Sequence, residues 1–271
     1  MRGFFNSVLV LAVTALPLAA GIDDDWKSYF TAAQQSAARK DFAHADLLYR
    51  RALKTAELFG DTDPRVGTTL EGFGTTLRGE KKLQEAETTL RRAMEILATD
   101  PGEDSAEYAR CHFDLAGVLM DEGKYNPALE SLKRALGTFM EKLGPHDVNT
   151  ATAYCMQGDS YRMLKNYSSA EPALKRCAEM RSDDGGIGTP EFGEAANSLA
   201  LVYQNLGKYS AADTYFNLAA KVREITLGIL SPELADTLEA HSTLLHQLGR
   251  DDEAKRKARL AATIRAHVKN K

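Results

Sequence analysis

The segment Glu194–Leu230, EAANSLALVYQNLGKYSAADTYFNLAAKVREITLGIL, decides the fold of this chain. Its apolar residues recur at helical spacing on both sides of Gly207, which predicts two amphipathic helices joined by a turn. One small residue of the second helix recurs every 42 residues, or within one residue of that step: Ala45, Ala86, Ala128, Ala170, Ala212 and Ala254. The segment is therefore one repeat of an array, in which neighbouring repeats bury the apolar surface together.

Two more series of small residues keep this register. The first lies in the first helix of each repeat: Ala33, Gly74, Ala116, Gly158, Ala200 and Ser242. The second lies seven residues after the alanine series: Ala52, Ala93, Ala135, Cys177, Ala219 and Ala261. Because packed helices lie only about 8–10 Å apart, small side chains are expected where they cross. The sequence therefore predicts an all-α fold of six stacked helical hairpins.

The end repeats should differ from the middle ones, because an open stack needs caps. In the first repeat Ser36 stands where later repeats have a large residue such as Leu77. The last helix has an apolar stripe and a basic remainder. The predicted stripe is Ala254, Ala258, Ala261, Ile264 and Val268, and the basic residues beside it are Arg256, Lys257 and Arg259.

The small-residue pattern resembles the tetratricopeptide repeat, which has one small residue in its first helix and two alanines in its second, as at Ala200, Ala212 and Ala219. The resemblance covers residues 26–268. It implies a right-handed α-solenoid of about six helix-turn-helix repeats that binds proteins or peptides on its concave side.

The junctions between repeats are similar to those of the kinesin-light-chain type of this repeat. The similarity rests on the longer period and on junctions such as Leu227-Gly228-Ile229-Leu230-Ser231-Pro232. The junctions at Thr99–Ser105 and Ser182–Pro190 depart from this pattern.

Residues 1–21 have the layout of a secretory signal peptide. Arg2 is followed by the apolar run Val8–Leu16 and then by Ala19, Ala20 and Gly21. The apolar run is shorter than the roughly 20 residues that a spanning helix requires, which argues against an uncleaved anchor. We expect cleavage after Ala20 or Gly21, export to a periplasm or the exterior, and a solenoid domain at residues 22–271.

Charge and cysteine content bound the function further. The chain has 34 basic and 38 acidic residues, a balance that gives no support for nucleic-acid binding. Its three cysteines, Cys111, Cys155 and Cys177, lack the spacing of a metal site. They are expected to be small buried residues, with one bridged pair as the open alternative in an oxidising compartment.

No pattern in the sequence predicts catalytic residues, a cofactor or a metal. His241 and His246 are five residues apart on a helix and so face different ways, and the other four histidines are scattered. The loop Asp183–Gly188 follows a helix and lacks the Lys-Ser/Thr ending of a phosphate-binding loop. We expect a non-catalytic scaffold. An enzyme with its site in the inter-repeat loops is the alternative from another class.

The candidate partner-binding residues lie on first-helix faces turned away from the second helices. They are Arg110, Phe113, Met120, Arg162, Asn197, Leu201 and Gln204. Gly117 should leave a notch between Phe113 and Met120, and the two arginines favour a partner segment with an acidic residue. The alternative is that Phe113, Met120 and Leu201 pack between successive first helices.

The basic residues near the carboxyl end allow a second function. Lys255–Arg259, with Lys269 and Lys271, would suit a membrane-apposed assembly factor that uses the last helix. A solvated cap face explains the same residues, since charged groups on an exposed terminal helix need no other cause. A protein or peptide partner is therefore expected, and membrane contact is not favoured.

Overall fold

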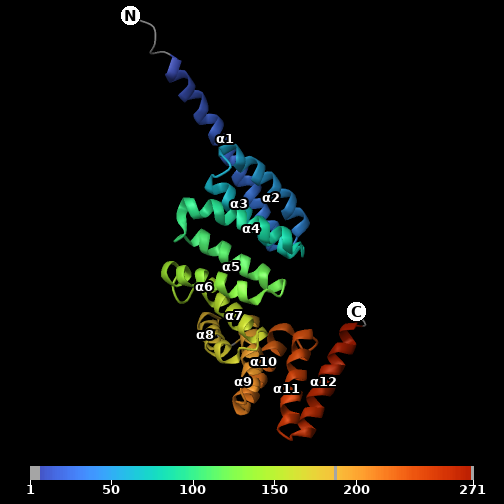
Figure 1. The fold of residues 1–271 in the computed structure, drawn as a ribbon. Helices are drawn as coiled ribbons and strands as arrows, with labels where there is room; N and C mark the ends of the chain where they lie inside the picture. Colours follow the sequence, from blue (N-terminus) through green and yellow to red (C-terminus); the bar gives the residue numbers. More distant parts are fainter. Residues whose placement is uncertain (1–6, 186–187, 270–271) are drawn as a thin grey trace, which may run out of the picture. The chain divides into compact units, whose positions relative to one another are not determined.

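The computed structural model describes the backbone of residues 7–185 and 188–269 and the side chains of residues 20–182 and 188–269. This part of the chain is helical and contains no β-strand. The helices, drawn in Figure 1, are α1 (Ser7–Ala38), α2 (Phe42–Ala56), α3 (Pro64–Gly79), α4 (Leu83–Leu97), α5 (Ala106–Asp121), α6 (Tyr125–Lys142), α7 (Val148–Met163), α8 (Tyr167–Gly185), α9 (Pro190–Asn205), α10 (Tyr209–Leu227), α11 (Pro232–Gln247) and α12 (Asp251–Lys269).

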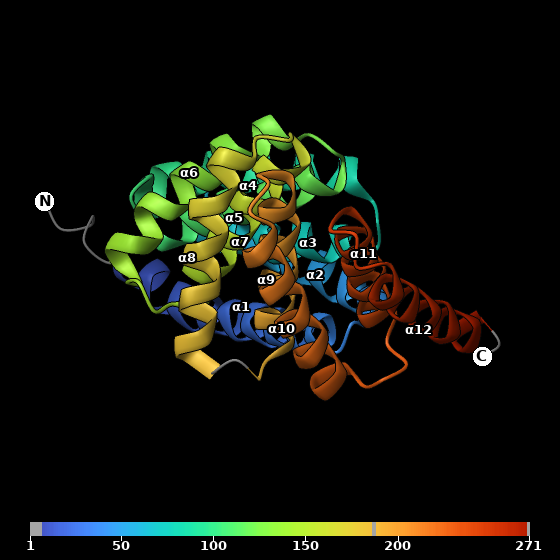
Figure 2. The same ribbon diagram turned by 90° about the horizontal axis from the view of Figure 1, so that it is seen from below.

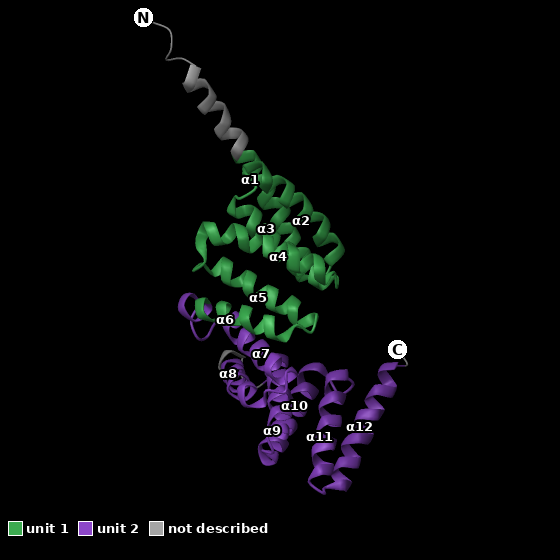
Figure 3. Ribbon diagram, viewed as in Figure 1, with its two compact units in different colours: residues 1–138 green, residues 139–271 purple. Residues whose placement is uncertain are grey.

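The chain divides into two compact units, unit 1 at residues 1–138 and unit 2 at residues 139–271 (Figure 3). In unit 1 the helices α1 to α5 pack in chain order, each against the next. Unit 2 repeats this arrangement from α7 to α12, and its last hairpin, α11 with α12, is seen side by side in Figures 1 and 2. This nearest-neighbour stacking is what the repeat period predicts.

The small residues lie at the predicted helix crossings. Every alanine of the 42-residue series is buried, and Ala254, at 5% exposure, is the most exposed of them. A β-carbon on Gly74 would come within 2.6 Å of Leu90 Cγ, and one on Gly158 would collide with Leu174. The hydroxyl of Ser242 donates a hydrogen bond to the carbonyl of Ala254 at 2.9 Å. The predicted register and the all-α repeat fold are thus confirmed.

The beginnings of the helices and their turns also follow the 42-residue step. Five first helices start at a residue whose side chain caps the helix: Asp63, Ser105, Asp147, Thr189 and Ser231. Each hairpin turn contains a residue with positive φ: Lys40, Lys81, Gly123, Lys165, Gly207 and Gly249. Glycine adopts this conformation freely, whereas lysine does so at a cost.

An ion pair recurs between consecutive repeats within each unit. A basic residue at the hairpin turn pairs with the acid that follows the packing alanine of the preceding repeat. The pairs are Lys82–Asp46 at 3.7 Å, Lys124–Glu87 at 2.9 Å, Lys208–Glu171 at 2.7 Å and Arg250–Asp213 at 2.6 Å. Between the third and fourth repeats the corresponding positions are Leu129 and Asn166, which carry no charge.

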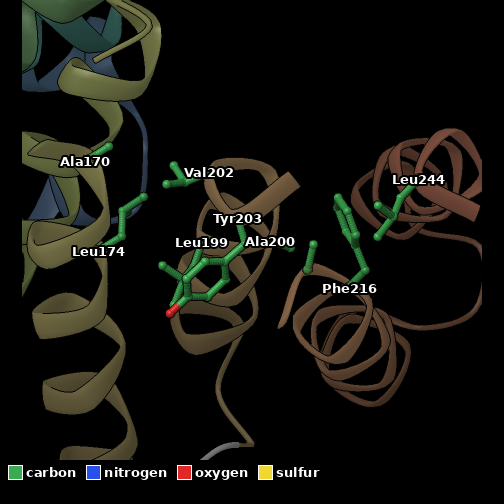
Figure 4. Close-up of a cluster of buried hydrophobic side chains, with 9 residues drawn as sticks. Ala170, Leu174, Leu199, Ala200, Val202, Tyr203, Phe216 and Leu244 are labelled. Carbon is green, nitrogen blue, oxygen red and sulfur yellow. The ribbon is translucent and has the colours of Figure 1, made fainter. Parts of the chain in front are cut away.

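The buried core of unit 2 is continuous from one hairpin to the next. Figure 4 shows one cluster of it, contributed by α8, α9, α10 and α11: Ala170, Leu174, Leu199, Ala200, Val202, Tyr203, Phe216 and Leu244. At the end of the stack the buried stripe of α12 is narrower than predicted. Ala254, Ala261 and Ile264 are buried, but Ala258 and Val268 are exposed, because no further helix covers them among the described residues.

Two questions left open by the sequence are answered in part. Cys155 on α7 and Cys177 on α8 form a disulfide, while Cys111 is a buried free thiol. Of the two divergent junctions, the first contains a single irregular turn at Ala98–Gly102 with a cis peptide bond before Pro101. The second includes residues 186–187, which lie outside the described part.

The amino-terminal helix α1 begins within the predicted signal peptide, and cleavage there stays a prediction. Within the described residues, no helix combines the length and the apolar character that crossing a membrane requires.

Candidate binding surface on the first helices

All seven candidate residues lie on first helices and are half-buried. Unit 1 contains three of them on α5: Arg110, Phe113 and Met120. Unit 2 contains the other four, on α7 and α9: Arg162, Asn197, Leu201 and Gln204.

In unit 1 the guanidinium of Arg110 is already paired. Its Nε lies 3.3 Å from Glu71 Oε1 and its Nη2 lies 3.5 Å from Glu107 Oε1. The Glu71 side chain is only 14% exposed, and burial raises the pKa of its carboxyl despite the attraction of Arg110. Arg110 therefore serves first to compensate carboxylates of its own chain.

Asp114 and Tyr49, which the sequence reasoning did not select, belong to the same place. Burial, followed by the negative Glu71, raises the pKa of Asp114 well above its ordinary value. Burial together with Glu71 and Asp114 also raises the pKa of Tyr49 to about 12. The sequence contained a signal for this pair of acids. Glu71 lies one repeat, or 42 residues, before Phe113, which is the residue next to Asp114, so the two acids occupy adjacent repeat positions on neighbouring first helices.

The notch predicted at Gly117 is filled, which corrects that expectation. The guanidinium of Arg78 covers Gly117 so closely that a β-carbon there would collide with it. Arg78 is held in place by two hydrogen bonds to the Asp121 carboxylate, at 2.9 and 3.3 Å. A side chain from α3 thus occupies the space that the sequence alone left open.

In unit 2 two of the four candidate residues, Arg162 and Gln204, are hydrogen-bonded within the unit. Asp159 Oδ1 accepts a hydrogen bond from Arg162 Nε at 2.9 Å and another from the Ser198 hydroxyl at 2.9 Å. Gln204 Nε2 donates to Gln247 Oε1 of α11 at 3.0 Å. Arg162, like Arg110, is therefore paired within its own unit.

The other two candidates of unit 2 are turned inward in part. Leu201 packs against the cluster of Figure 4, which is the packing role that the alternative gave it. The Oδ1 atom of Asn197 is buried and has no hydrogen-bond partner among the described residues. Leu201 and this oxygen therefore contribute less exposed surface than the sequence predicted.

The side-chain links between first helices recur at two spacings. Arg110–Glu71 and Ser198–Asp159 join residues 39 apart, and Arg78–Asp121 and Gln204–Gln247 join residues 43 apart. Since the repeat is 42 residues long, both spacings connect neighbouring first helices. The indole nitrogen of Trp26 donates to the Thr69 hydroxyl at 2.9 Å, again 43 residues away. These faces therefore carry polar groups held in fixed positions.

The predicted separation of the two histidines on α11 is confirmed. His241 is 1% exposed, stacks on Phe216 and has its Nε2 2.6 Å from Asp213 Oδ1, whereas the His246 side chain is 78% exposed. Burial lowers the pKa of His241, and the Asp213 hydrogen bond opposes this shift. The pair links α10 to α11 inside unit 2. In the described part of the chain, no three His, Cys, Asp or Glu residues are placed to bind a metal ion together.

Comparison with known proteins agrees with the repeat architecture. A model of the tetratricopeptide repeat matches residues 78–141 and 108–183, and a second model of the same description matches residues 193–233. One similar sequence is the clustered mitochondria protein homolog of Meyerozyma guilliermondii, which is 31% identical over 131 residues. These residues are 47% of this chain but 10% of the relative, so the chain spans about a tenth of that protein's length.

Solved structures share the fold at low identity. The apo form of RapI has a TM-score of 0.67 at 17% identity and covers 91% of this chain and 100% of its own. Kinesin-light-chain TPR-like repeats from Podosopora anserina have a TM-score of 0.64 at 15% identity, covering 75% and 96%. BtubC from P. vanneervenii has a TM-score of 0.63 at 20% identity, covering 75% and 89%. Identities this low show the fold alone.

Proposed function

Because the chain belongs to the tetratricopeptide repeat family, with repeats of the kinesin-light-chain type, we propose that it is an exported, non-catalytic scaffold. Its partner would be a protein or peptide segment that lies across the first helices. Proteins of this fold bind through surfaces formed by stacked repeats. The residues that would contact the partner are the half-buried polar and charged groups of these helices.

The observation that carries the proposal is the set of links between neighbouring first helices. Arg110 is fixed by Glu71, and Arg78 by Asp121, before any partner arrives. Groups that are already ordered lose little conformational freedom on binding, which favours affinity. A surface of partly exposed, prearranged arginines and carboxylates is suited to recognition, because such groups supply directional hydrogen bonds.

The charge of the unit 1 face changes the expected chemistry of the partner. Two guanidiniums, of Arg78 and Arg110, face a larger number of carboxylates: Glu71, Glu107, Asp114 and Asp121. The acidic partner residue expected from the sequence would find no unpaired guanidinium here, because Arg78 and Arg110 are already held by carboxylates of this chain. A segment that brings a lysine or arginine side chain to Glu71 and Asp114 would compensate both carboxylates, so we infer a basic segment for this unit.

The test begins with a partner identified by crosslinking and affinity capture in the native compartment. In unit 1, the double variant Glu71→Gln/Asp114→Asn should weaken capture by more than about tenfold, that is about 1.4 kcal/mol. It should leave the helical circular-dichroism signal intact, because each amide has the size of the carboxyl that it replaces and Arg110 keeps Glu107 as a partner. The matched control is Glu85→Gln/Glu95→Gln on the exposed face of α4, which removes the same charge elsewhere. Capture that survives in the first variant, or is lost equally in the control, contradicts the proposed site.

Two observations support export. Residues 1–21 have the layout of a signal peptide, and Cys155 and Cys177 form a disulfide of the kind that persists in oxidising compartments. Intact-mass measurement on protein from its native source should give a chain that begins at Gly21 or Ile22 and lacks two hydrogen atoms. Retention of Met1 would contradict cleavage, and a mass without that loss of hydrogen would contradict the oxidised state.

A further inference from the structure

One inter-repeat junction of unit 2 carries apolar residues that its turn does not require. Gly60, Gly144 and Gly228 occupy equivalent junctions and all have positive φ. The two residues that follow are Asp61-Thr62 at the first junction and Pro145-His146 at the second, but Ile229-Leu230 at the third. The same turn therefore forms with polar or neutral residues, and its geometry does not explain Ile229 and Leu230.

These two side chains are part of a larger exposed apolar area. Ile229 is 62% exposed and Leu230 41%, and Ile225 and Leu227 at the end of α10 are 71% and 42% exposed. Leu260 of α12 is 50% exposed. Exposed apolar side chains gathered in one place mark an interaction site more often than scattered ones do. Ile229 of the junction 228–231 and Leu260 of α12 line one hollow together with Lys221 and Glu224 of α10, and we call this the α10–α12 surface.

A hollow of about 400 Å³ opens on the α10–α12 surface. Its floor is made by Leu234 and Leu238, which belong to the buried core of the last hairpin. Ile229 and Leu260 line its edge. The surface thus combines protruding apolar side chains with an apolar recess.

Lysine side chains border the same hollow. Lys221 and Lys257 line it, and neither has a carboxylate at ion-pair distance in the described part of the chain. Lys257 Nζ instead lies 3.5 Å from the amide oxygen of Asn217. Glu224 is the acidic residue of the lining, so the hollow is bordered by two cations and one carboxylate.

We propose that the α10–α12 surface binds the surface of an anionic lipid membrane. Ile229 and Leu230 project from a turn, so they can enter the boundary between headgroups and acyl chains, where burial of their apolar area is favourable. Lys221 and Lys257 lie beside them and would meet lipid phosphates, each contributing attraction that falls with added salt. Exposed apolar side chains with lysines directly beside them fit the headgroup region of an anionic bilayer, which accepts both kinds of group together. This surface is separate from the Glu71–Asp114 site.

The first experiment uses the full chain and one introduced thiol. Because Cys111 is buried and Cys155 is bridged to Cys177, Ile229→Cys gives an accessible position for an environment-sensitive fluorophore. Leu58→Cys in unit 1 is the control, since Leu58 is 68% exposed. Phosphatidylglycerol-containing vesicles should shift the emission of the label at 229 to the blue and leave the label at 58 unchanged, and pure phosphatidylcholine vesicles should shift neither. Any binding through the apolar run near the amino terminus is common to both proteins. No shift at 229, or an equal shift at 58, overturns the proposal.

Two variants test the same surface without a label. Ile229→Asp/Leu230→Thr copies the Asp61-Thr62 junction, so it should fold with an unchanged melting temperature. In co-sedimentation with phosphatidylglycerol-containing vesicles it should bind at least about tenfold more weakly than the parent chain, as should Lys221→Glu/Lys257→Glu. Vesicle binding that is unaffected by both variants overturns the proposal. So does loss of capture of a protein partner in these variants when the parent chain leaves the vesicles unbound, which would assign the surface to that protein instead.

Discussion

The first-helix faces of the two units share their spacing and differ in chemistry. In unit 1 the links at 39 and 43 residues are ion pairs, Arg110–Glu71 and Arg78–Asp121. In unit 2 the links at the same spacings are Ser198–Asp159 and Gln204–Gln247, which use a hydroxyl and an amide and lie at other repeat positions, since Arg110 corresponds to Glu194 and Arg78 to Arg162. The repeat period thus sets the spacing of the links, and the residue types decide which positions pair and how the contact responds to acid, salt and substitution.

A fall in pH should produce the largest difference in stability between the two units. In unit 1 both ring nitrogens of His112 are buried and have no hydrogen-bond partner among the described residues, and burial together with Arg134 lowers its pKa to about 4. As the pH falls below the ordinary value of about 6.5, the unfolded chain takes up the proton first, so stability is full above pH 6.5 and is lost toward pH 4, by up to about 3 kcal/mol. In unit 2 the partner Asp213 offsets part of the corresponding shift of His241.

Hydrogen exchange followed by mass spectrometry at pH 7 and pH 4.5 measures this difference, with peptides from α5 losing protection before peptides from α11. His112→Leu supplies the control, because Leu70 and Leu238 occupy the same repeat position. The variant should remove most of the acid sensitivity of α5. Acid sensitivity that is unchanged in His112→Leu assigns the effect to other groups.

Enlarging a packing alanine should affect both units alike. Ala86 in unit 1 and Ala212 in unit 2 are fully buried at equivalent crossings. Replacing either with leucine overpacks the hairpin and should cost about 1–3 kcal/mol, with damage to adjacent repeats because each is stabilised by its neighbours. Thermal melts of the two variants measure the cost. Unchanged midpoints would show that the register is wrong, and a loss in one unit alone would show that the units differ in packing as well as in charge.

Removing one partner of a first-helix link should affect unit 1 more than unit 2. Arg110→Gln leaves the Glu71 carboxylate, whose side chain is 14% exposed, without its cation. The loss should be about 1 kcal/mol, between the values for exposed and buried ion pairs, because the arginine is partly exposed. Gln204→Ala in unit 2 removes a neutral exposed link and should change stability by less than about 0.5 kcal/mol. Urea denaturation of both variants ranks them, and a larger loss for Gln204→Ala reverses the comparison.

The smallest expected effect concerns the hairpin turns. Lys81 in unit 1 and Lys165 in unit 2 have φ of 65° and 58°, at the repeat position where Gly123 and Gly207 have φ of 76° and 72°. Lysine pays a steric penalty there, so Lys81→Gly and Lys165→Gly should each stabilise the protein by about 0.5 kcal/mol, whereas Gly207→Ala should destabilise it by about 1 kcal/mol. Calorimetric melts test the three variants together. A loss of stability in both lysine variants would mean that their side chains contribute contacts that outweigh the strain.

Much of the fold follows from the printed sequence. The 42-residue recurrence of Ala212 and its equivalents requires helices that cross closely at a fixed interval, so hairpin number, helix order and the buried small residues could all be predicted. The helix caps from Asp63 to Ser231 recur at the same step and fix where first helices begin. Because these features depend on backbone spacing and on the smallest side chains, they need no knowledge of rotamers.

The binding surface was predictable only as a location. The sequence predicted Arg110 and Arg162 on the free faces of first helices, but the tertiary structure determined that Glu71 and Asp159 pair with them and that Arg78 fills the space over Gly117. Long charged side chains have many rotamers and reach residues of a neighbouring repeat, so packing decides their partners. Sequence spacing also does not predict the pairing of Cys155 with Cys177 or the exposure of Ile229 and Leu230. The disulfide depends on which helix surfaces are in contact, and the exposure depends on which surfaces the neighbouring helices leave uncovered.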